Sequence, residues 1–339
     1  MLRKFTFHLN LLIPPLFLLL GIAIGWAAQN ARQPTTSDAS QKSSPLRLAG
    51  YSLVSPLLLC DSGFTGNAQS LGILEKKLQE SANRSVESGA ANVVSVYFRD
   101  LNTGSEININ GNEKYFPASL KKVPMMMQYY KRAESDPALL STKGVLTGSV
   151  DLNGGVEIKP SQTPSYGQSY SVDELISLMI KYSDNISFQM LSQNMSDSDL
   201  SAVYRDLQVR YSESNTSAAD FMTPYQFSLF LRTLYNATYL DANYSQKALT
   251  LLSQSDFKDG LVAGVPSNVT IAHKFGVLTQ HNGDVLLERE LHDCGIVFDA
   301  TTPYLMCVMT KSNGELSQAE RVIADLSAIA YKEMKDGYK

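Results

Sequence analysis

Apolar and polar positions alternate along the chain with two periods, and the change between them predicts the order of its elements. Apolar residues recur every three to four positions over 69–86 and 317–334, which is typical of amphipathic helices. β-branched and aromatic residues fill 92–99, and the polar turn 100–104 leads into a second such run, which predicts a hairpin. Further strands are predicted over 105–110, 270–278, 295–298 and 304–310.

The middle of the chain carries helical patterns that begin at capping residues. Ser171 and Glu174 form the S-x-x-E pattern of a capping box. Other helices are predicted after Pro117, Asp184, Ser196, Thr223 and Asp241. Because strands lie at both ends and helices between them, we predict an α+β fold with an inserted all-helical lobe. The sheet lobe spans about 57–118 and 265–339, the helical lobe spans about 119–264, and a site is expected between them.

The N-terminus has the pattern of a targeting segment. Arg3 and Lys4 precede an apolar run over 11–28, whose length lies between that of a secretory signal and a membrane-spanning helix. Residues 1–28 are therefore predicted to be a signal peptide or a membrane anchor, and the basic flank places the rest of the chain outside the cytoplasm. Residues 29–56, largely polar, are predicted to be a flexible linker that leads to a folded domain over 57–339.

Composition narrows the class of protein. The chain has 339 residues, of which 44% are hydrophobic and 18% charged, enough to bury one large core. Its net charge of −4 gives no basic surface for nucleic acid, so we expect no nucleic-acid partner. Its four histidines form no H-x-H or H-E-x-x-H cluster, and we expect no metal and no other cofactor. We expect a monomer.

Ser119 and Lys122 are the first candidates for chemistry. At the start of the helix predicted after Pro117, a spacing of three residues puts both side chains on one face. A lysine whose pKa is lowered by burial can take the proton of a serine and make it a nucleophile. The helix N-terminus favours the negative charge that develops in such a reaction. The alternative is that Ser119 serves only as a helix N-cap.

Two more motifs follow in order. Ser183-Asp184-Asn185 lies at a junction of two helical patterns, and Lys274-Phe275-Gly276 lies in a strand-like run. S-x-x-K, S-D-N and K-x-G in this order resemble the active-site motifs of class A β-lactamases and penicillin-binding proteins. The resemblance covers the chain from about residue 68 to its end. It implies the β-lactamase/transpeptidase-like fold, in which helices flank a five-stranded antiparallel sheet.

The resemblance also implies roles. Ser119 would be acylated, Lys122 would accept its proton, and Ser183 would pass a proton to the leaving nitrogen. Further roles are oxyanion stabilisation by the backbone N–H groups of Ser119 and Val277, substrate amide binding by Asn185, positive potential from Lys274, and room for the substrate backbone at Gly276. The alternatives are ordinary structural ones: an N-cap at Ser183, a satisfied polar group at Asn185 and a strand-edge lysine at Lys274.

Two departures from the family pattern affect the expected activity. Phe275 stands where relatives carry a hydroxyl that contacts the substrate carboxylate, which argues against ordinary penicillins as substrates. The E-x-x-L-N pattern that supplies a deacylating glutamate is missing from residues 211–223. Glu213 is the one glutamate there and is the candidate base, with a solvated loop carboxylate as the alternative.

Three functions are carried forward. The first is hydrolysis of β-lactam amides through an acyl-enzyme at Ser119. The second is a peptidoglycan D-Ala-D-Ala carboxypeptidase, a penicillin-binding protein with slow deacylation, acting on the stem peptide. The third is a cell-wall binding protein that does not hydrolyse. All three place the domain outside the cytoplasm, attached to the membrane through its N-terminal segment or released after cleavage.

Three cysteines leave an odd count in an exported protein. Cys294 and Cys307 flank a predicted hairpin turn over 299–302, and a register symmetric about that turn places them directly opposite, within disulfide range. Both a disulfide and two buried thiols fit this position, and the pair of thiols is our expectation. Cys60 has no evident partner.

Overall fold

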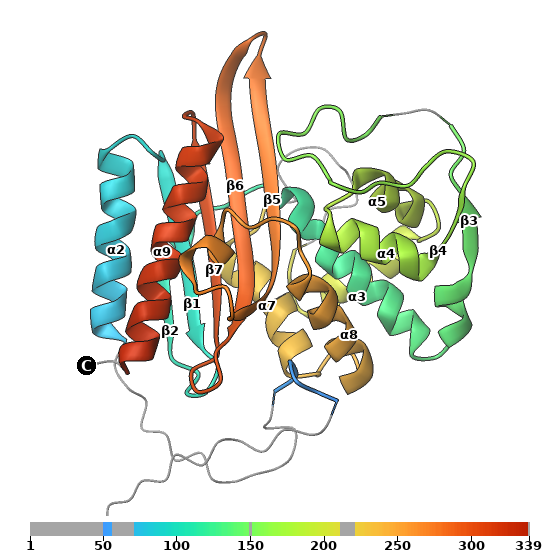
Figure 1. The fold of residues 1–339 in the computed structure, drawn as a ribbon, viewed down its shortest axis with the longest axis horizontal. Coiled ribbons are helices and arrows are strands. Elements are labelled where there is room, and N and C mark those ends of the chain that lie inside the picture. The colour runs from blue at the N-terminus through green and yellow to red at the C-terminus, as the bar shows by residue number, and fades with distance from the viewer. Residues whose placement is uncertain (1–49, 56–70, 149–150, 211–220, 338–339) are drawn as a thin grey trace, which may run out of the picture. The chain divides into compact units, whose positions relative to one another are not determined.

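The computed structural model describes residues 50–55, 71–148, 151–210 and 221–337, all within one compact unit over 45–339. At its centre is a five-stranded antiparallel sheet in the order β2-β1-β7-β6-β5 (Figure 1). The strands are β1 (Val93–Asp100), β2 (Glu106–Ile109), β5 (Thr270–Asn282), β6 (Val285–Phe298) and β7 (Tyr304–Ser312). The predicted α+β fold with a five-stranded antiparallel sheet is therefore confirmed.

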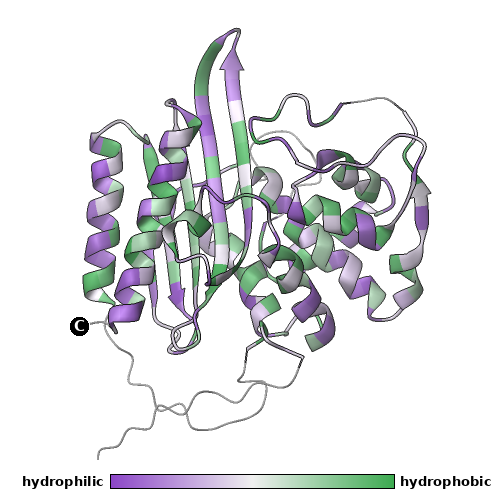
Figure 2. Ribbon diagram, viewed as in Figure 1, coloured by the Kyte–Doolittle hydropathy of each residue, from purple (hydrophilic) through white to green (hydrophobic). Residues whose placement is uncertain are grey.

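Helices cover both faces of the sheet. The first and last described helices, α2 (Gly72–Glu87) and α9 (Leu316–Asp336), lie side by side on one face (Figure 1). Figure 2 shows apolar and polar residues interspersed along both helices, and their buried apolar residues belong to one core with residues of the strands. Burial of these apolar residues is what holds each amphipathic helix against the sheet.

The opposite face of the sheet packs against the inserted lobe. Its helices are α3 (Lys122–Ala133), α4 (Val172–Lys181), α5 (Asn185–Ser192), α6 (Asp197–Asp206), α7 (Pro224–Tyr235) and α8 (Ala242–Ser253). The predicted caps are present: side chains accept hydrogen bonds from first-turn N–H groups at Ser171, Asp184, Ser196, Thr223 and Asp241. The lobe is not entirely helical, because β3 (Lys143–Val145) pairs with β4 (Ser169–Ser171). Short 3₁₀ turns are η3 (Ala118–Lys121), η4 (Pro137–Ser141) and η5 (Leu261–Gly264).

The β5–β6 hairpin is longer than the sequence predicts. We expected strands over 270–278 and 295–298, whereas pairing continues to Asn282 and Val285 at the hairpin tip. The extension projects beyond the other strands (Figure 1). The hairpin tip over 280–288 is largely exposed, and the rest of the missed stretch, 289–294, is buried but consists mostly of polar and charged residues. Neither part therefore shows the alternation of apolar and polar positions by which strands are recognised.

The domain begins before the predicted boundary at residue 57. Leu53 and Val54 are buried in the core shared by the sheet and the inserted lobe. The backbone N–H of Leu53 donates to Gln246 Oε1 at 2.8 Å, and that of Ser55 donates to the Tyr235 carbonyl at 2.7 Å. The predicted linker 29–56 is therefore wrong over 50–55, because buried apolar side chains and paired backbone groups hold this segment on α7 and α8.

The N-terminal predictions for 1–28, and most of the linker, lie outside the described residues. Among the helices that the structure describes, none has the length and apolar character needed to cross a bilayer.

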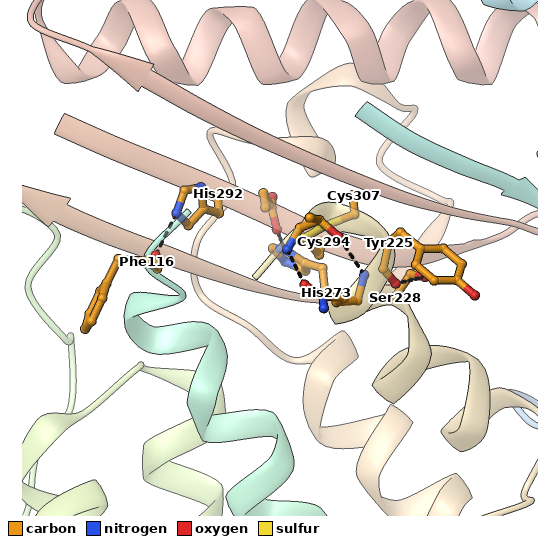
Figure 3. The surroundings of a disulfide bond; sticks show 10 residues. Phe116, Tyr225, Ser228, His273, His292, Cys294 and Cys307 are labelled. Carbon is orange, nitrogen blue, oxygen red and sulfur yellow. Dashed lines mark hydrogen bonds and ion pairs between the residues drawn. A yellow bond between two sulfur atoms is a disulfide. The ribbon is translucent and has the colours of Figure 1, made fainter. Parts of the chain in front are cut away.

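Cys294 on β6 and Cys307 on β7 form a disulfide (Figure 3). The structure confirms the predicted register, since the two residues are direct partners across the β6–β7 pair. The expectation of two separate thiols is wrong: both side chains leave the sheet on the same face, where the sulfurs meet. Cys60 lies outside the described residues.

Candidate active site

Ser119 and Lys122 meet as the sequence predicts. Ser119 lies in η3, directly after Pro117, and Lys122 is the first residue of α3. Lys122 Nζ lies 3.0 Å from Ser119 Oγ. Ser119 is partly exposed whereas Lys122 is 1% exposed, so the hydroxyl can reach a ligand while its neighbouring amine is shielded from water.

The second motif, Ser183-Asp184-Asn185, contacts the same Lys122 amine. Lys122 Nζ also donates to the Ser183 carbonyl at 2.5 Å, to Ser183 Oγ at 3.2 Å and to Asn185 Oδ1 at 2.8 Å. Ser183 has a left-handed backbone (φ 57°), which turns its carbonyl and hydroxyl to the same amine at the junction of α4 and α5. The structure thus brings Ser119, Lys122, Ser183 and Asn185 together.

The environment of Lys122 lowers its pKa well below the usual range of a lysine. Burial is the main cause, and the positive charges of Lys274 and Lys121 act in the same direction. The negative charge of Asp184 opposes them. A lowered pKa makes the neutral amine more accessible, and a neutral amine can accept the proton of the serine hydroxyl beside it, so Lys122 has the property that a general base needs.

Lys274 reaches the site from β5. Its Nζ donates to Ser183 Oγ at 2.8 Å and to the Phe275 carbonyl at 3.0 Å, and the side chain is fully buried. Burial lowers the pKa of Lys274 to about 7, against the opposing charges of Asp293 and Asp256. The Ser183 hydroxyl therefore lies between two buried amines.

Gly276 lets β5 approach the nucleophile closely. A Cβ atom at this position would lie 2.9 Å from the Pro117 carbonyl oxygen and 3.2 Å from the Ser119 nitrogen. Only a residue without a side chain allows the Pro117–Ser119 backbone to lie against the strand in this way. Val277, whose N–H is a candidate oxyanion donor, is the next residue of β5.

Phe275 faces the other side of the sheet. Its ring stacks on Phe257 with centroids 4.4 Å apart and is 2% exposed. Lys274 Nζ lies 4.1 Å from the centroid of the same ring. The ring therefore shields the Lys274 ammonium and offers no hydroxyl to a substrate carboxylate.

A polar loop that the sequence did not single out supports the second motif. Asp184 is fully buried, and its Oδ2 accepts from Asn153 Nδ2 at 2.7 Å and from Thr163 Oγ1 at 2.6 Å. Asn153 Oδ1 in turn accepts from the Asn185 backbone N–H at 3.0 Å. The loop segment 151–163 has no periodicity, and only the fold shows that it holds Asp184 and Asn185.

Glu213, the candidate deacylation base, lies outside the described residues. Within the described ranges, His, Cys, Asp and Glu side chains form no group of three that could hold a metal ion.

The sequence model described as the Beta-lactamase enzyme family matches residues 74–334. The chain belongs to this family, which makes it a β-lactamase-related, serine-hydrolase-like protein. No curated protein sequence matches the chain.

Solved structures share the fold at low sequence identity. "Structure of PBP-A" is 19% identical, with a TM-score of 0.62 over 78% of this chain and 97% of that one. A class A β-lactamase from Mycobacterium abscessus is also 19% identical, with a TM-score of 0.63 over 76% of this chain and 99% of that one. A β-lactamase from Sphaerobacter thermophilus DSM 20745 is 17% identical, with a TM-score of 0.64 over 78% and 98% of the two chains. These likenesses show the β-lactamase/transpeptidase-like fold.

Proposed function

We propose that this protein is a serine hydrolase of β-lactam amides that forms an acyl-enzyme at Ser119. The observation that carries the proposal is the position of the Lys122 amine, buried and 3.0 Å from Ser119 Oγ. A buried amine with a lowered pKa beside a partly exposed hydroxyl is the arrangement that activates a serine. An N-cap role for Ser119 would require neither the amine nor its burial.

Acylation follows from these positions. Neutral Lys122 takes the proton of Ser119 as Oγ attacks the carbonyl carbon of the amide. The negative charge on the carbonyl oxygen is stabilised by the backbone N–H groups of Ser119 and Val277, and losing one such donor typically costs about 3–4 kcal/mol. Ser183, which contacts Lys122, gives its proton to the leaving nitrogen and regains one from Lys122. The C–N bond breaks and an ester remains on Ser119.

Substrate binding is assigned to the neighbouring groups. Asn185 holds the amide side chain of the substrate, and the substrate backbone lies along β5 at Gly276. Lys274 is fully buried and bonded to Ser183, so its charge acts on the substrate mainly through that hydroxyl.

The rate of deacylation distinguishes the first candidate function, β-lactam hydrolysis, from the second, a D-Ala-D-Ala carboxypeptidase. A base must activate the water that hydrolyses the ester, and residues 211–223 lack the E-x-x-L-N pattern. This absence favours, as the second candidate, a penicillin-binding D-Ala-D-Ala carboxypeptidase whose β-lactam ester turns over slowly. Glu213 is the base to test in the first case.

The test is intact-mass spectrometry of the full chain mixed with benzylpenicillin and followed over time, with Ser119→Ala as the control. An adduct that forms and clears within minutes supports the β-lactamase. An adduct that persists for hours supports the carboxypeptidase, which should then release D-Ala from a D-Ala-D-Ala peptide. If folded protein forms no adduct with several β-lactams, both enzymatic functions fail and the non-hydrolytic cell-wall binder is left.

We also propose that the domain works as a monomer outside the cytoplasm, attached to the membrane through residues 11–28. The support is the apolar run and the basic residues before it. Fractionation of cells that express the full chain should leave it in the alkaline-washed membrane pellet, and deletion of residues 1–28 should keep it in the cytoplasm. Light scattering of the detergent-purified chain should give the mass of one copy.

A further inference from the structure

One row of residues crosses the sheet beneath the nucleophile. Ser95 on β1, Met309 on β7, His292 on β6 and Gly276 on β5 are successive register partners. Residues that are direct partners across antiparallel strands point to the same face. Here that face packs against the inserted lobe, because Met309 belongs to the core shared with its helices.

The segment that leads to Ser119 contacts this row in order. Tyr115 OH donates to Ser95 Oγ at 2.8 Å, so the segment starts over β1. His292 Nε2 lies 3.0 Å from the Phe116 carbonyl oxygen, over β6. At Gly276 on β5, the Pro117 carbonyl lies directly against the strand. Residues 115–117, just before the nucleophile, therefore contact the sheet at β1, β6 and β5.

Phe116 is held on both of its backbone polar groups by side chains of β6. Glu290 Oε2 accepts from the Phe116 N–H at 2.8 Å, while the carbonyl is bonded to His292, as Figure 3 shows for the latter pair. His292 Nε2 also lies 3.3 Å from Glu290 Oε2. Glu290 is 2% exposed and His292 is fully buried, so both side chains are shielded from water, whereas Phe116 is partly exposed.

The hydrogen bond between His292 and the Phe116 carbonyl defines which ring nitrogen carries the hydrogen. A carbonyl oxygen can only accept, so Nε2 must carry the hydrogen. The other ring nitrogen, Nδ1, is buried and has no hydrogen-bond partner in the structure. Tyr115 packs edge-on against the ring at a centroid distance of 5.3 Å, which fixes its plane. His292 is thus a buried hydrogen-bond donor, held in a fixed orientation towards the Phe116 carbonyl.

The backbone that follows Phe116 is in an unfavourable conformation. Ala118, two residues after Phe116 and one before Ser119, has φ 47°, in the left-handed region that residues with a Cβ rarely adopt. Such a conformation persists when the surrounding structure holds it. The bonds at Phe116 on one side and the close approach at Gly276 on the other supply that restraint, and the Ser119 N–H is the next group along the chain.

We propose that Glu290 and His292 are positioning residues for Ser119: by holding the Phe116 peptide on β6 they fix the direction of the Ser119 hydroxyl and backbone N–H. The inference rests on the proposed function, in which Ser119 is the nucleophile. Both residues act on the acylation step and not on the initial binding of the substrate, since their contacts are with the Phe116 backbone, the Tyr115 ring and each other. A displacement of about 1 Å at a reacting group can reduce a rate by about 100-fold.

The experiment compares paired variants of the full chain. His292→Phe keeps a ring against Tyr115 but removes the donor, whereas His292→Gln keeps a donor. Glu290→Leu removes the acceptor for the Phe116 N–H, whereas Glu290→Gln keeps one. Val308→Ala is the matched control, because Val308 is fully buried on the opposite face of the sheet and its truncation lowers stability without touching the segment before Ser119.

Two quantities are measured for each variant. Time-resolved intact-mass spectrometry with benzylpenicillin gives the acylation rate constant and the dissociation constant of the preceding complex. Amide hydrogen exchange reports the protection of the peptide that covers residues 115–121. We expect His292→Phe and Glu290→Leu to acylate about 10- to 100-fold more slowly with unchanged initial binding and faster exchange in this peptide. The two conservative variants and Val308→Ala should stay within about threefold of the wild type.

Equal acylation and exchange in His292→Phe, Glu290→Leu and the wild type would overturn the inference. An equal loss in Val308→Ala would also overturn it, since the effect would then be one of general stability. If the wild type itself forms no adduct, the proposed function fails, and the exchange measurement alone decides whether Glu290 and His292 hold the segment.

Discussion

Lys122 and Lys274 donate to the same hydroxyl, that of Ser183, at 3.2 and 2.8 Å. Two ammonium groups this close in a buried site repel each other, and the charge of Lys274 lowers the pKa of Lys122. Two carboxylates, Asp293 and Asp256, support the charge of Lys274, whereas Lys122 has Asp184 alone and is opposed by both Lys274 and Lys121, so we expect Lys122 to be the amine that gives up its proton. One amine becomes a base while the other remains a cation, which is how two lysines can have different roles at one serine.

This order predicts a bell-shaped pH dependence of Ser119 acylation. The rate rises with pH as Lys122 loses its proton, and it falls above about pH 7 as Lys274, whose pKa is about 7, loses its charge.

Lys274→Arg should remove the fall at high pH, because the guanidinium stays charged. Asp184→Asn should move the rise to lower pH, because Asp184 raises the pKa of Lys122. A rate that rises only above pH 9 would contradict the neutral base.

Replacement of the base tests the mechanism directly. In Lys122→Arg the side chain stays protonated at every accessible pH and cannot accept the serine proton. We expect the acylation rate constant to fall by about 100- to 10,000-fold, the usual contribution of a general base. Mass spectrometry with benzylpenicillin measures it, and circular dichroism verifies the fold. Acylation within tenfold of the wild type would assign the base elsewhere.

The buried ammonium of Lys274 should lower the free energy of unfolding. Its pKa is about 7 in the folded protein and near 10.4 when unfolded, so between these values the unfolded state binds more protons and stability rises with pH. Below about pH 7 the destabilisation is complete and reaches up to about 5 kcal/mol, at about 1.4 kcal/mol per pKa unit. Urea unfolding should therefore show Lys274→Met to be more stable than the wild type at pH 7, with a gap that narrows towards pH 10. A less stable variant at pH 7 would refute this cost.

Gly276→Ala should affect both the fold and the reaction. The new Cβ would lie 2.9 Å from the Pro117 carbonyl, a backbone atom that must move to make room. We expect a loss of about 1–3 kcal/mol in the free energy of unfolding and at least tenfold slower acylation. Gly144→Ala is the control, since a Cβ there meets no atom within 4 Å. Equal acylation in both variants would show that the approach of β5 does not position Ser119.

Counting the free cysteines tests the Cys294–Cys307 disulfide, and a double variant measures its contribution to the free energy of unfolding. In denaturant without reductant, iodoacetamide should modify one cysteine per chain, Cys60, and after reduction it should modify all three. Cys294→Ala combined with Cys307→Ala should lower the free energy of unfolding by about 2–4 kcal/mol, the typical value for a native disulfide. Three modifications without reductant would instead restore the expectation of two thiols.

The sequence by itself determined most of the helices, the positions of the main strands and their order, but not the β3–β4 pair or the full length of the β5–β6 hairpin. Periodicity and capping residues located the helices that follow Ser171, Asp184, Ser196, Thr223 and Asp241, because a helix start depends on bonds between near neighbours. The three motifs and their order indicated the family for the same reason: each is a short local pattern. The register at Cys294 and Cys307 also followed from the turn between them, although their oxidation did not.

Only the tertiary structure decided which distant groups meet. The sequence marked Gly276 by its motif, but not the close approach of Pro117 that requires it. The same holds for Asn153 and Thr163 on Asp184, and for Glu290 and His292 on Phe116. These pairs are separated by 21 to 176 positions in the chain, and their side chains follow no period. Such contacts arise when the sheet and the inserted lobe pack together, and a local pattern contains no record of that packing.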